Sequence, residues 1–152
     1  MFQFLGLDAS KVHFIQRLNA RPGVILRILT LRANTNTEHF PQLDWVLHEK
    51  GHVLIFCPSI WTGFQLAVYL WHLDPRSSIV NQTIRLFNSL NSTPYNLKTL
   101  QLLRENEHAK ITIATDKLSV GVDIPNFEMV VIIDPVDLDD LWQKGGRVGC
   151  DF

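Results

Sequence analysis

Short apolar runs alternate with amphipathic stretches along most of this chain, and this alternation constrains the fold more than any other feature. Strands are predicted where the apolar runs fall, at residues 24–31, 52–57, 110–114 and 128–133, with a more polar strand at 78–86. Strands that follow one another through helices pair in parallel with right-handed crossovers. The sequence therefore predicts an α/β fold, a three-layer, doubly wound domain around a mainly parallel sheet.

Helical periodicity fills the intervals between these strands. Helices are predicted at residues 38–50, 60–73, 95–105 and 137–144. The inward faces are expected to be Phe64, Ala67, Val68 and Trp71 in the second helix, and Leu97, Leu100 and Leu103 in the third. The tryptophans of helical segments, Trp45, Trp61 and Trp71, are expected to pack in the core or at a lobe interface, and not to form base-stacking platforms. Residues 1–22 are predicted to be a connector from a preceding lobe, and residues 23–152 the domain itself.

Composition limits the classes of function that the chain can have. Apolar residues make up 46% and charged residues 19%, as in globular domains, and the net charge of −1 gives no overall basic field. Contact with nucleic acid must therefore be local. Cys57 and Cys150 fit neither a disulfide framework nor a zinc site, which indicates a reducing, intracellular compartment. No stretch approaches the ~20 apolar residues of a membrane span, so no membrane partner is expected.

Two of the predicted strands lead directly into polar, glycine-containing loops. The strand at 110–114 is followed by Thr115, Asp116, Gly121 and Asp123, and the strand at 128–133 is followed by Asp134 and then by Gln143, Gly146 and Arg147. The carboxyl ends of parallel strands meet at one edge of a sheet, so a site is expected there. Each residue also has a structural explanation, because Thr and Asp cap helices and Gly permits turns.

A chain that hydrolyses nucleoside triphosphates unaided needs a phosphate loop of the form GxxxxGK[ST], and this sequence contains none. Asp134 is therefore predicted to be a solvated strand terminus and not a magnesium ligand. The acidic residues Asp134, Asp137, Asp139 and Asp140 are expected to form a solvated helix start. They would repel a phosphate backbone, so nucleic acid is expected to pass elsewhere.

The segments IATDKLSVGVDIPN and LWQKGGRVGCD resemble motifs V and VI of superfamily two helicases, and VLIFCPS resembles motif IV. These motifs belong to the second RecA-like lobe. Within the superfamily the sequence is most similar to RecQ-like DNA helicases, because Trp142, Gln143 and Lys144 lead into the glycines and Val120 is apolar where DEAD-box proteins carry arginine. The resemblance implies a lobe of an ATP-dependent, 3′ to 5′ DNA helicase of DNA repair and recombination, located in the nucleus.

The resemblance also implies roles for individual residues and partners. The implied roles are catalytic for Arg147 (an arginine finger) and Gln143, ATP-binding for Gly121, Asp123 and Gly146, and nucleic-acid backbone contact for Ser59, Thr115 and Asp116. ATP and Mg²⁺ are expected to bind only with an N-terminal RecA-like lobe, supplied in cis or in trans, and no zinc is expected. The implied substrate is single-stranded or partially duplex DNA.

One residue departs from the family pattern, since Cys150 stands where motif VI ends in a second arginine. An arginine finger is worth roughly 10³ to 10⁵ in rate, and a cysteine supplies no such charge. Hydrolysis is therefore expected to be impaired unless Arg147 alone suffices, and the isolated chain is expected to be inactive. Two alternatives remain: a catalytically degenerate regulatory or scaffold module, and a small flavodoxin-like ligand binder.

Overall fold

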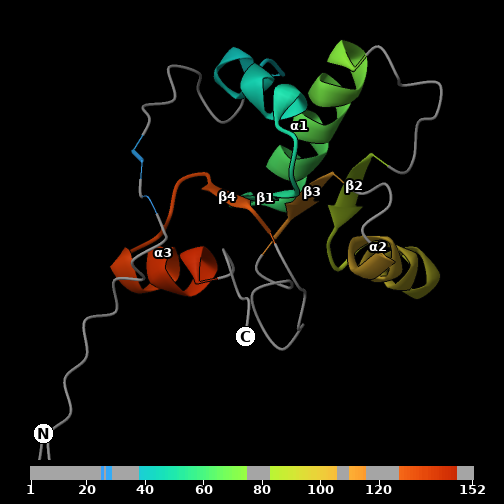
Figure 1. Cartoon of the computed structure of the whole chain (residues 1–152). Helices are drawn as coiled ribbons and strands as arrows, with labels where there is room; N and C mark the ends of the chain where they lie inside the picture. Colours follow the sequence, from blue (N-terminus) through green and yellow to red (C-terminus); the bar gives the residue numbers. More distant parts are fainter. Residues whose placement is uncertain are drawn as a thin grey trace, which may run out of the picture.

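The computed structural model of this chain describes residues 25, 27, 28, 38–74, 83–105, 110–115 and 127–146. From residue 38 onward, helices and strands follow one another in the order that the sequence predicts (Figure 1). The elements are η2 (Pro41–His48), β1 (Val53–Phe56), α1 (Ile60–Leu73), β2 (Ile84–Phe87), α2 (Thr93–Glu105), β3 (Ile111–Ala114), β4 (Met129–Ile132) and α3 (Leu138–Gly145). No helix in the described ranges is long and apolar enough to cross a membrane.

The four strands form one sheet in the order β2-β3-β1-β4, and every neighbouring pair is parallel. From β1 the chain reaches β2 at one side of the sheet, returns to β3, and then crosses β1 to β4. The pairing is level: Phe87, Ala114, Phe56 and Ile132, the last residues of their strands, lie side by side. The predicted parallel, doubly wound sheet is confirmed, and all four carboxyl ends lie at one edge.

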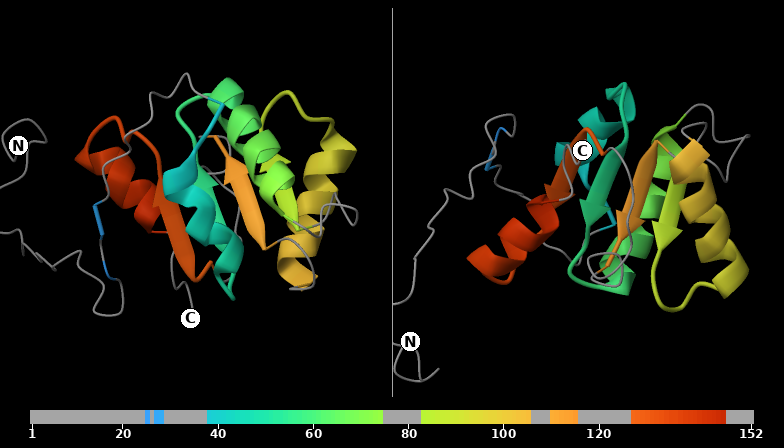
Figure 2. Two further views of the ribbon diagram at one scale, coloured as in Figure 1. Left: turned by 90° about the horizontal axis from the view of Figure 1, so that it is seen from above. Right: turned by 60° about the horizontal axis from the view of Figure 1, so that its bottom comes forward.

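Helices cover both faces of this sheet, which gives the predicted three layers. The 3-10 helix η2 and α1 lie on one face, and α2 and α3 lie on the other (Figures 1 and 2). Alternate strand residues serve the two sides: Val53 and Ile55 join the core under η2 and α1, whereas Leu54 and Phe56 join the core of the opposite face. A strand buried in this way on both faces favours apolar residues along its whole length, which explains the continuous run at residues 52–57.

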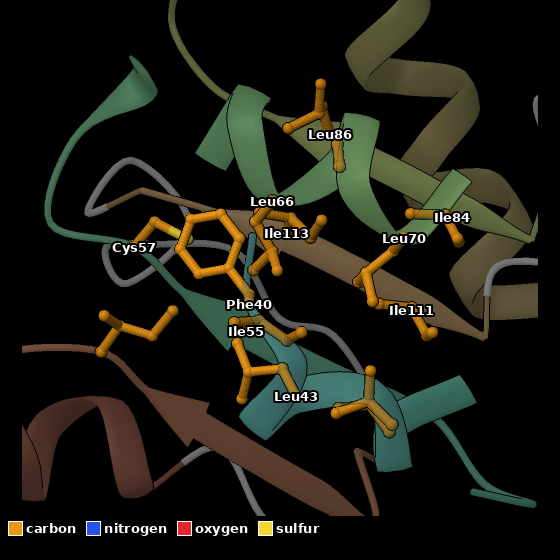
Figure 3. Packing of buried hydrophobic residues seen from close by; sticks show 14 residues of the cluster. Phe40, Leu43, Ile55, Cys57, Leu66, Leu70, Ile84, Leu86, Ile111 and Ile113 are labelled. Atoms are coloured by element: carbon orange, nitrogen blue, oxygen red, sulfur yellow. The ribbon is translucent and has the colours of Figure 1, made fainter. Parts of the chain in front are cut away.

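The larger core lies between the sheet and the layer of η2 and α1 (Figure 3). Phe40, Leu66 and Leu70 pack there against strand side chains and are almost fully buried. Cys57 belongs to the same cluster as a free thiol. Burial raises the pKa of the Cys57 thiol to about 12, so this side chain stays protonated and acts as a small apolar residue.

The segment predicted as a helix at residues 38–50 is a 3-10 helix in the structure and covers only Pro41–His48. Phe40, Leu43 and Val46 are buried, and they are spaced three residues apart. In a 3-10 helix, side chains three residues apart lie directly above one another, whereas in an α-helix each successive one is displaced around the helix axis. The apolar spacing of three therefore suits the observed helix better than the predicted one.

The inward faces of both long helices differ in part from the prediction, although Ala67 and Leu103 are buried as expected. In α1 the buried residues include Leu66 and Leu70, whereas Phe64 is 47% exposed. In α2 Leu97 is 60% exposed, and a polar residue, Thr99, is fully buried in its place. The sequence prediction assigned only apolar residues to the interior, so it missed a polar side chain that has a buried partner.

That partner is Arg85, a buried residue of β2. Its Nε donates to Thr99 Oγ1 at 3.0 Å, its Nη2 donates to the Tyr95 carbonyl at 3.2 Å, and its guanidinium lies 3.8 Å from the centroid of the Tyr95 ring. A buried guanidinium needs such partners, because leaving it without them would cost several kcal/mol, on the order of 3. Arg85 thereby fixes α2 against β2.

The last strand in the order, β4, is less buried than the other three strands. All four residues of β4 are half-buried, whereas those of β1, β2 and β3 are buried.

The strand predicted at residues 24–31 is not formed at the three residues of this range that the structure describes. Two of them, Ile25 and Ile28, are 81% and 88% exposed. An apolar run becomes a strand only where it pairs with a neighbour. The first part of the strand predicted at 78–86 lies outside the described residues, and β2 begins at Ile84.

Two leucines of α1 give a matched test of this packing. Leu70 is fully buried and Leu73 is 44% exposed. We expect Leu70→Ala to lower the free energy of unfolding by about 2 to 5 kcal/mol, because it leaves a cavity under α1. Leu73→Ala should change it by less than about 0.5 kcal/mol. Urea denaturation followed by circular dichroism measures both, and equal losses would contradict the observed orientation of α1.

Candidate functional site

The strand pairing continues one residue beyond the carboxyl ends of three strands. Cys57 N–H donates to the Ala114 carbonyl at 2.8 Å, Ile133 N–H donates to the Phe56 carbonyl at 3.0 Å, and Thr115 N–H donates to the Phe87 carbonyl at 3.4 Å. The loops after β1, β3 and β4 therefore leave the sheet from fixed points at the same level. This edge is where the sequence predicts a functional site.

Ser59 lies at this edge as the N-cap of α1. Its Oγ accepts a hydrogen bond from the Thr62 N–H at 3.0 Å and lies 2.9 Å from Thr62 Oγ1. The capping role follows from its sequence position, since serine before a helical apolar run is a common helix start. Ser59 is exposed, and the first turn of α1 contains no acidic residue. The partial positive charge of a helix N-terminus therefore faces solvent beside it, and no carboxylate of that turn offsets it.

Thr115 follows β3 directly and is half-buried. Its own backbone N–H is engaged with the Phe87 carbonyl, so the group that Thr115 itself can offer to a phosphate is the side-chain hydroxyl. Ser59 and Thr115 come from the adjacent strands β1 and β3, whose last residues Phe56 and Ala114 are paired. The structure thus brings these two predicted residues to one edge of the sheet.

The remaining predicted residues divide into two groups. Gln143 and Gly146 are described, and both belong to α3 or its C-terminal end. The others lie outside the described residues, and their predicted roles stay predictions: Asp116, Gly121, Asp123 and Arg147.

The short helix α3 is held at both ends by local hydrogen bonds. The Asp137 side chain caps its first turn by accepting from the Asp140 N–H at 2.7 Å. Gly146 N–H donates to the Trp142 carbonyl at 2.9 Å and closes the last turn. The φ of Gly146 is −62°, an ordinary helical value, so its backbone does not require glycine. Gln143 is exposed on this helix.

Lys144 is a buried cation, which the sequence analysis named only for its position before the glycines of motif VI. Its Nζ lies 2.8 Å from Asp140 Oδ1 and 2.9 Å from Oδ2, and 5.6 Å from the centroid of the Phe56 ring. Because Phe56 is the last residue of β1, these contacts attach α3 to the carboxyl edge of the sheet. The hydrogen bond from Lys144 is the main cause that holds the pKa of Asp140 below its usual value. In the sequence, the spacing of four residues between Asp140 and Lys144 indicates that the two side chains can pair on one side of a helix.

This ion pair corrects part of the prediction for the acidic run. Asp137 and Asp139 are exposed as predicted, but Asp140 is paired with a buried lysine and is not simply a solvated residue at a helix start. Asp134 is exposed at the end of β4, as predicted, with a left-handed φ of 49°. Within the described part of the chain, no group of three or more His, Cys, Asp or Glu side chains is arranged to hold a metal ion.

An asparagine network shapes the loop after β2, which ends at the same edge. Asn88 Oδ1 accepts from the N–H groups of Leu90 and Asn91 at 3.0 and 3.1 Å. Asn91 Nδ2 donates to the Leu86 carbonyl and Asn96 Nδ2 donates to the Asn88 carbonyl, both at 2.9 Å. Three asparagines within nine residues are the sequence signal of such a hydrogen-bonded turn.

Comparison with known proteins adds independent information on this arrangement. Residues 38–151 match the family described as the helicase conserved C-terminal domain. The ATP-dependent RNA helicase DBP8 of Yarrowia lipolytica is 32% identical over 101 residues, 66% of this chain and 21% of that protein. The ATP-dependent rRNA helicase SPB4 of Debaryomyces hansenii is 37% identical over 62 residues, 38% of this chain and 10% of that protein.

A solved structure is similar as well, namely the yeast DEAD-box splicing factor Prp28. It superposes with a TM-score of 0.57 at 26% identity, over 77% of this chain and 24% of that one. This chain thus spans about a fifth of the DBP8 relative and about a quarter of Prp28. The relatives support the predicted helicase lobe and its RecA-like fold, but they are DEAD-box and RNA helicases. They do not support the RecQ-like branch or the implied roles in DNA repair and recombination.

The anchoring of α3 can be tested through its ion pair. We expect Asp140→Asn to lower the free energy of unfolding by about 1 to 3 kcal/mol at neutral pH, because it removes the carboxylate that faces a buried ammonium group. The folded state holds the pKa of Asp140 below its unfolded value, so this stabilisation is present at neutral pH and is lost as the pH falls through the folded pKa. Urea titrations of both proteins over a pH series measure the difference.

Asp139→Asn is the matched control, because it makes the same change at an exposed neighbour in the same turn. It should leave the free energy of unfolding within about 0.5 kcal/mol of the wild-type value. A loss of similar size in both variants would mean that the ion pair does not anchor α3.

Proposed function

Because this chain belongs to the helicase conserved C-terminal domain family, we propose that it acts as the second RecA-like lobe of an ATP-dependent RNA helicase. One observation carries the proposal: the family match spans residues 38–151 and includes every residue that the sequence assigns to the site. The fold supports it, since Ser59 and Thr115 lie at the carboxyl edge and Lys144 ties α3 to the same edge. RNA as the substrate is supported by the names of the relatives.

In this proposal the ATP site lies between two lobes. The sequence has no phosphate loop, so a first lobe in cis or in trans binds the phosphates of ATP and Mg²⁺. Arg147 then acts as the arginine finger that stabilises charge on the transferred phosphoryl group. Gly121 permits close approach to the nucleotide, and Asp123 accepts hydrogen bonds from the ribose hydroxyls.

The position of α3 explains how Gln143 and Gly146 would take part. They flank Lys144, which pairs with Asp140 within the same helix and lies over the Phe56 ring at the end of β1. Gln143 is exposed and can contact the opposite lobe, so it couples the nucleotide state to lobe closure. The backbone N–H of Gly146 already donates to the Trp142 carbonyl and is not available to ATP. Gly146 would therefore act indirectly, as the residue that connects α3 to Arg147.

The nucleic acid lies along the other part of the edge. Ser59, Thr115 and Asp116 contact its sugar-phosphate backbone, which gives binding without base recognition by these residues. Ser59 contributes through the N-terminus of α1, where the partial positive charge favours a phosphate group.

A second function is favoured by one specific observation, the cysteine at position 150. Motif VI ends in a second arginine in the family pattern, so Cys150 is consistent with a catalytically degenerate regulatory or scaffold module. Such a module would keep the fold and the nucleic-acid edge and would show no hydrolysis even with a complete cleft.

ATP hydrolysis separates these two functions. The 152-residue chain alone should show no steady-state ATPase activity, because it lacks a phosphate loop. Adding the first lobe of a related helicase should restore activity, and Cys150→Arg should raise it, whereas Arg147→Ala should lower it by on the order of 10³-fold. Hydrolysis by the isolated chain would refute the proposal, and no response to any first lobe would favour the module.

The choice of nucleic acid is tested by binding. We expect the chain to bind oligouridine more tightly than oligothymidine of equal length by about five- to tenfold, the value of one net hydrogen bond to a 2′-hydroxyl. Both affinities should fall with rising salt concentration, because phosphate contacts release counterions. Fluorescence anisotropy measures both ligands. Tighter binding of the DNA oligomer would instead support the RecQ-like prediction.

A further inference from the structure

Two aromatic residues of α1 are exposed side by side. Trp61 is 62% exposed and Phe64 is 47% exposed, and their rings are stacked with centroids 6.1 Å apart and planes inclined by 26°. The sequence predicted that Trp61 packs in the core or at a lobe interface and does not stack on bases, and that Phe64 lies on the inward face of the helix. Large exposed aromatic surfaces are uncommon on a domain surface and mark contact sites.

The position of this pair relates it to the carboxyl edge. Trp61 is two residues after Ser59, the N-cap of α1, and Phe64 follows three residues later on the same side of the helix. Since α1 starts immediately beyond β1, the two rings lie in its first turns, next to the serine to which a phosphate contact is assigned. Ser59 and the two rings therefore belong to the same end of α1.

The first turn of α1 carries no acidic residue, and the carboxylate that meets the same helix, Asp44 of η2, is bonded by Tyr69 further along it. No aspartate or glutamate occurs in α1, and its only ionisable side chains are Tyr69 and His72. The exposed carboxylates of the described edge, Asp134, Asp137 and Asp139, belong to the region of β4 and α3. Figure 1 shows that α1 and α3 lie on opposite faces of the sheet. The aromatic pair is thus on the face where a phosphate backbone meets no repulsion from those groups.

We propose that Trp61 and Phe64 form a stacking platform for a base of single-stranded nucleic acid, next to the phosphate contact at Ser59. The platform extends the proposed function, on which it rests, from the backbone to the bases. An indole ring can stack on any base, so the platform adds affinity without sequence preference. The rival occupant is an apolar surface of a partner protein, which would also cover two exposed aromatic rings.

The test compares two ligands of equal length, an oligouridine and an abasic ribose-phosphate oligomer. Base stacking on an aromatic side chain is worth about 1 to 3 kcal/mol per base, so Trp61→Ala should weaken oligouridine binding by about 5- to 150-fold. Binding of the abasic oligomer should stay unchanged. Trp61→Phe should keep most of the affinity for oligouridine. Fluorescence anisotropy with the whole chain at fixed salt concentration measures each affinity.

Leu73→Ala is the matched control, because Leu73 is exposed at the opposite end of α1. It should bind both oligomers like the wild type. Unchanged oligouridine binding by Trp61→Ala would overturn the platform and assign the pair to a protein contact. An equal loss for both oligomers would also overturn it, since the backbone site would then be affected.

The proposed function can fail separately from the platform. If the wild-type chain bound neither oligomer, the platform and the nucleic-acid part of the proposed function would both be refuted. If oligouridine binding depended on Trp61 while no first lobe restored ATPase activity, the platform would hold and the helicase function would fail.

Discussion

The level parallel pairing of the four strands is the constraint on which the described site depends. Phe87, Ala114, Phe56 and Ile132 end their strands side by side, and backbone hydrogen bonds continue the pairing into three of the loops that follow. A shift of one residue in any strand would move its buried side chains to the other face and misplace the loop. Leu54 and Ile55 belong to the cores on opposite faces of the sheet, so this packing fixes the register of β1. The same register fixes where Ser59 and Thr115 lie.

A second, polar constraint connects α3 to this edge. Lys144 is buried between its own helix and the Phe56 ring, and Asp140 supplies the matching charge. Arg85 has the corresponding role for α2, through Thr99 and Tyr95. In both cases a helix is fixed to the sheet by a buried cation with specific partners. Such contacts define a single orientation more strictly than apolar packing, which tolerates small shifts of one helix over another.

The sequence predicted the order and type of nearly all the described elements, because continuous apolar runs such as residues 52–57 have one simple structural explanation. It failed where polar residues turn inward, as Thr99 does, and where an apolar residue stays exposed, as Phe64 does. Burial of Lys144 could not be read from spacing alone, since the same spacing is common on solvated helix surfaces. Burial of a charge depends on a ring and a carboxylate that only the fold brings together.

The helicase lobe was predictable from two motifs because their glycines and polar residues occur in a fixed order after strands. The branch of the superfamily was not, since it depended on a few neighbouring residues such as Val120 and Trp142. Those residues had favoured the RecQ-like branch, whereas the similar proteins found by comparison are RNA helicases. Substrate choice requires the geometry of sugar contacts, which short motifs do not encode.

The backbone at Asp134 has a consequence for how this lobe can diverge. Its left-handed φ of 49° is accessible at low cost to glycine, asparagine and aspartate, whereas a β-branched residue would be strained by roughly 1 to 2 kcal/mol. This one residue sets the direction in which the chain leaves β4 for α3. Most substitutions at this position are therefore expected to cost stability, even though the side chain is exposed and is not part of the core.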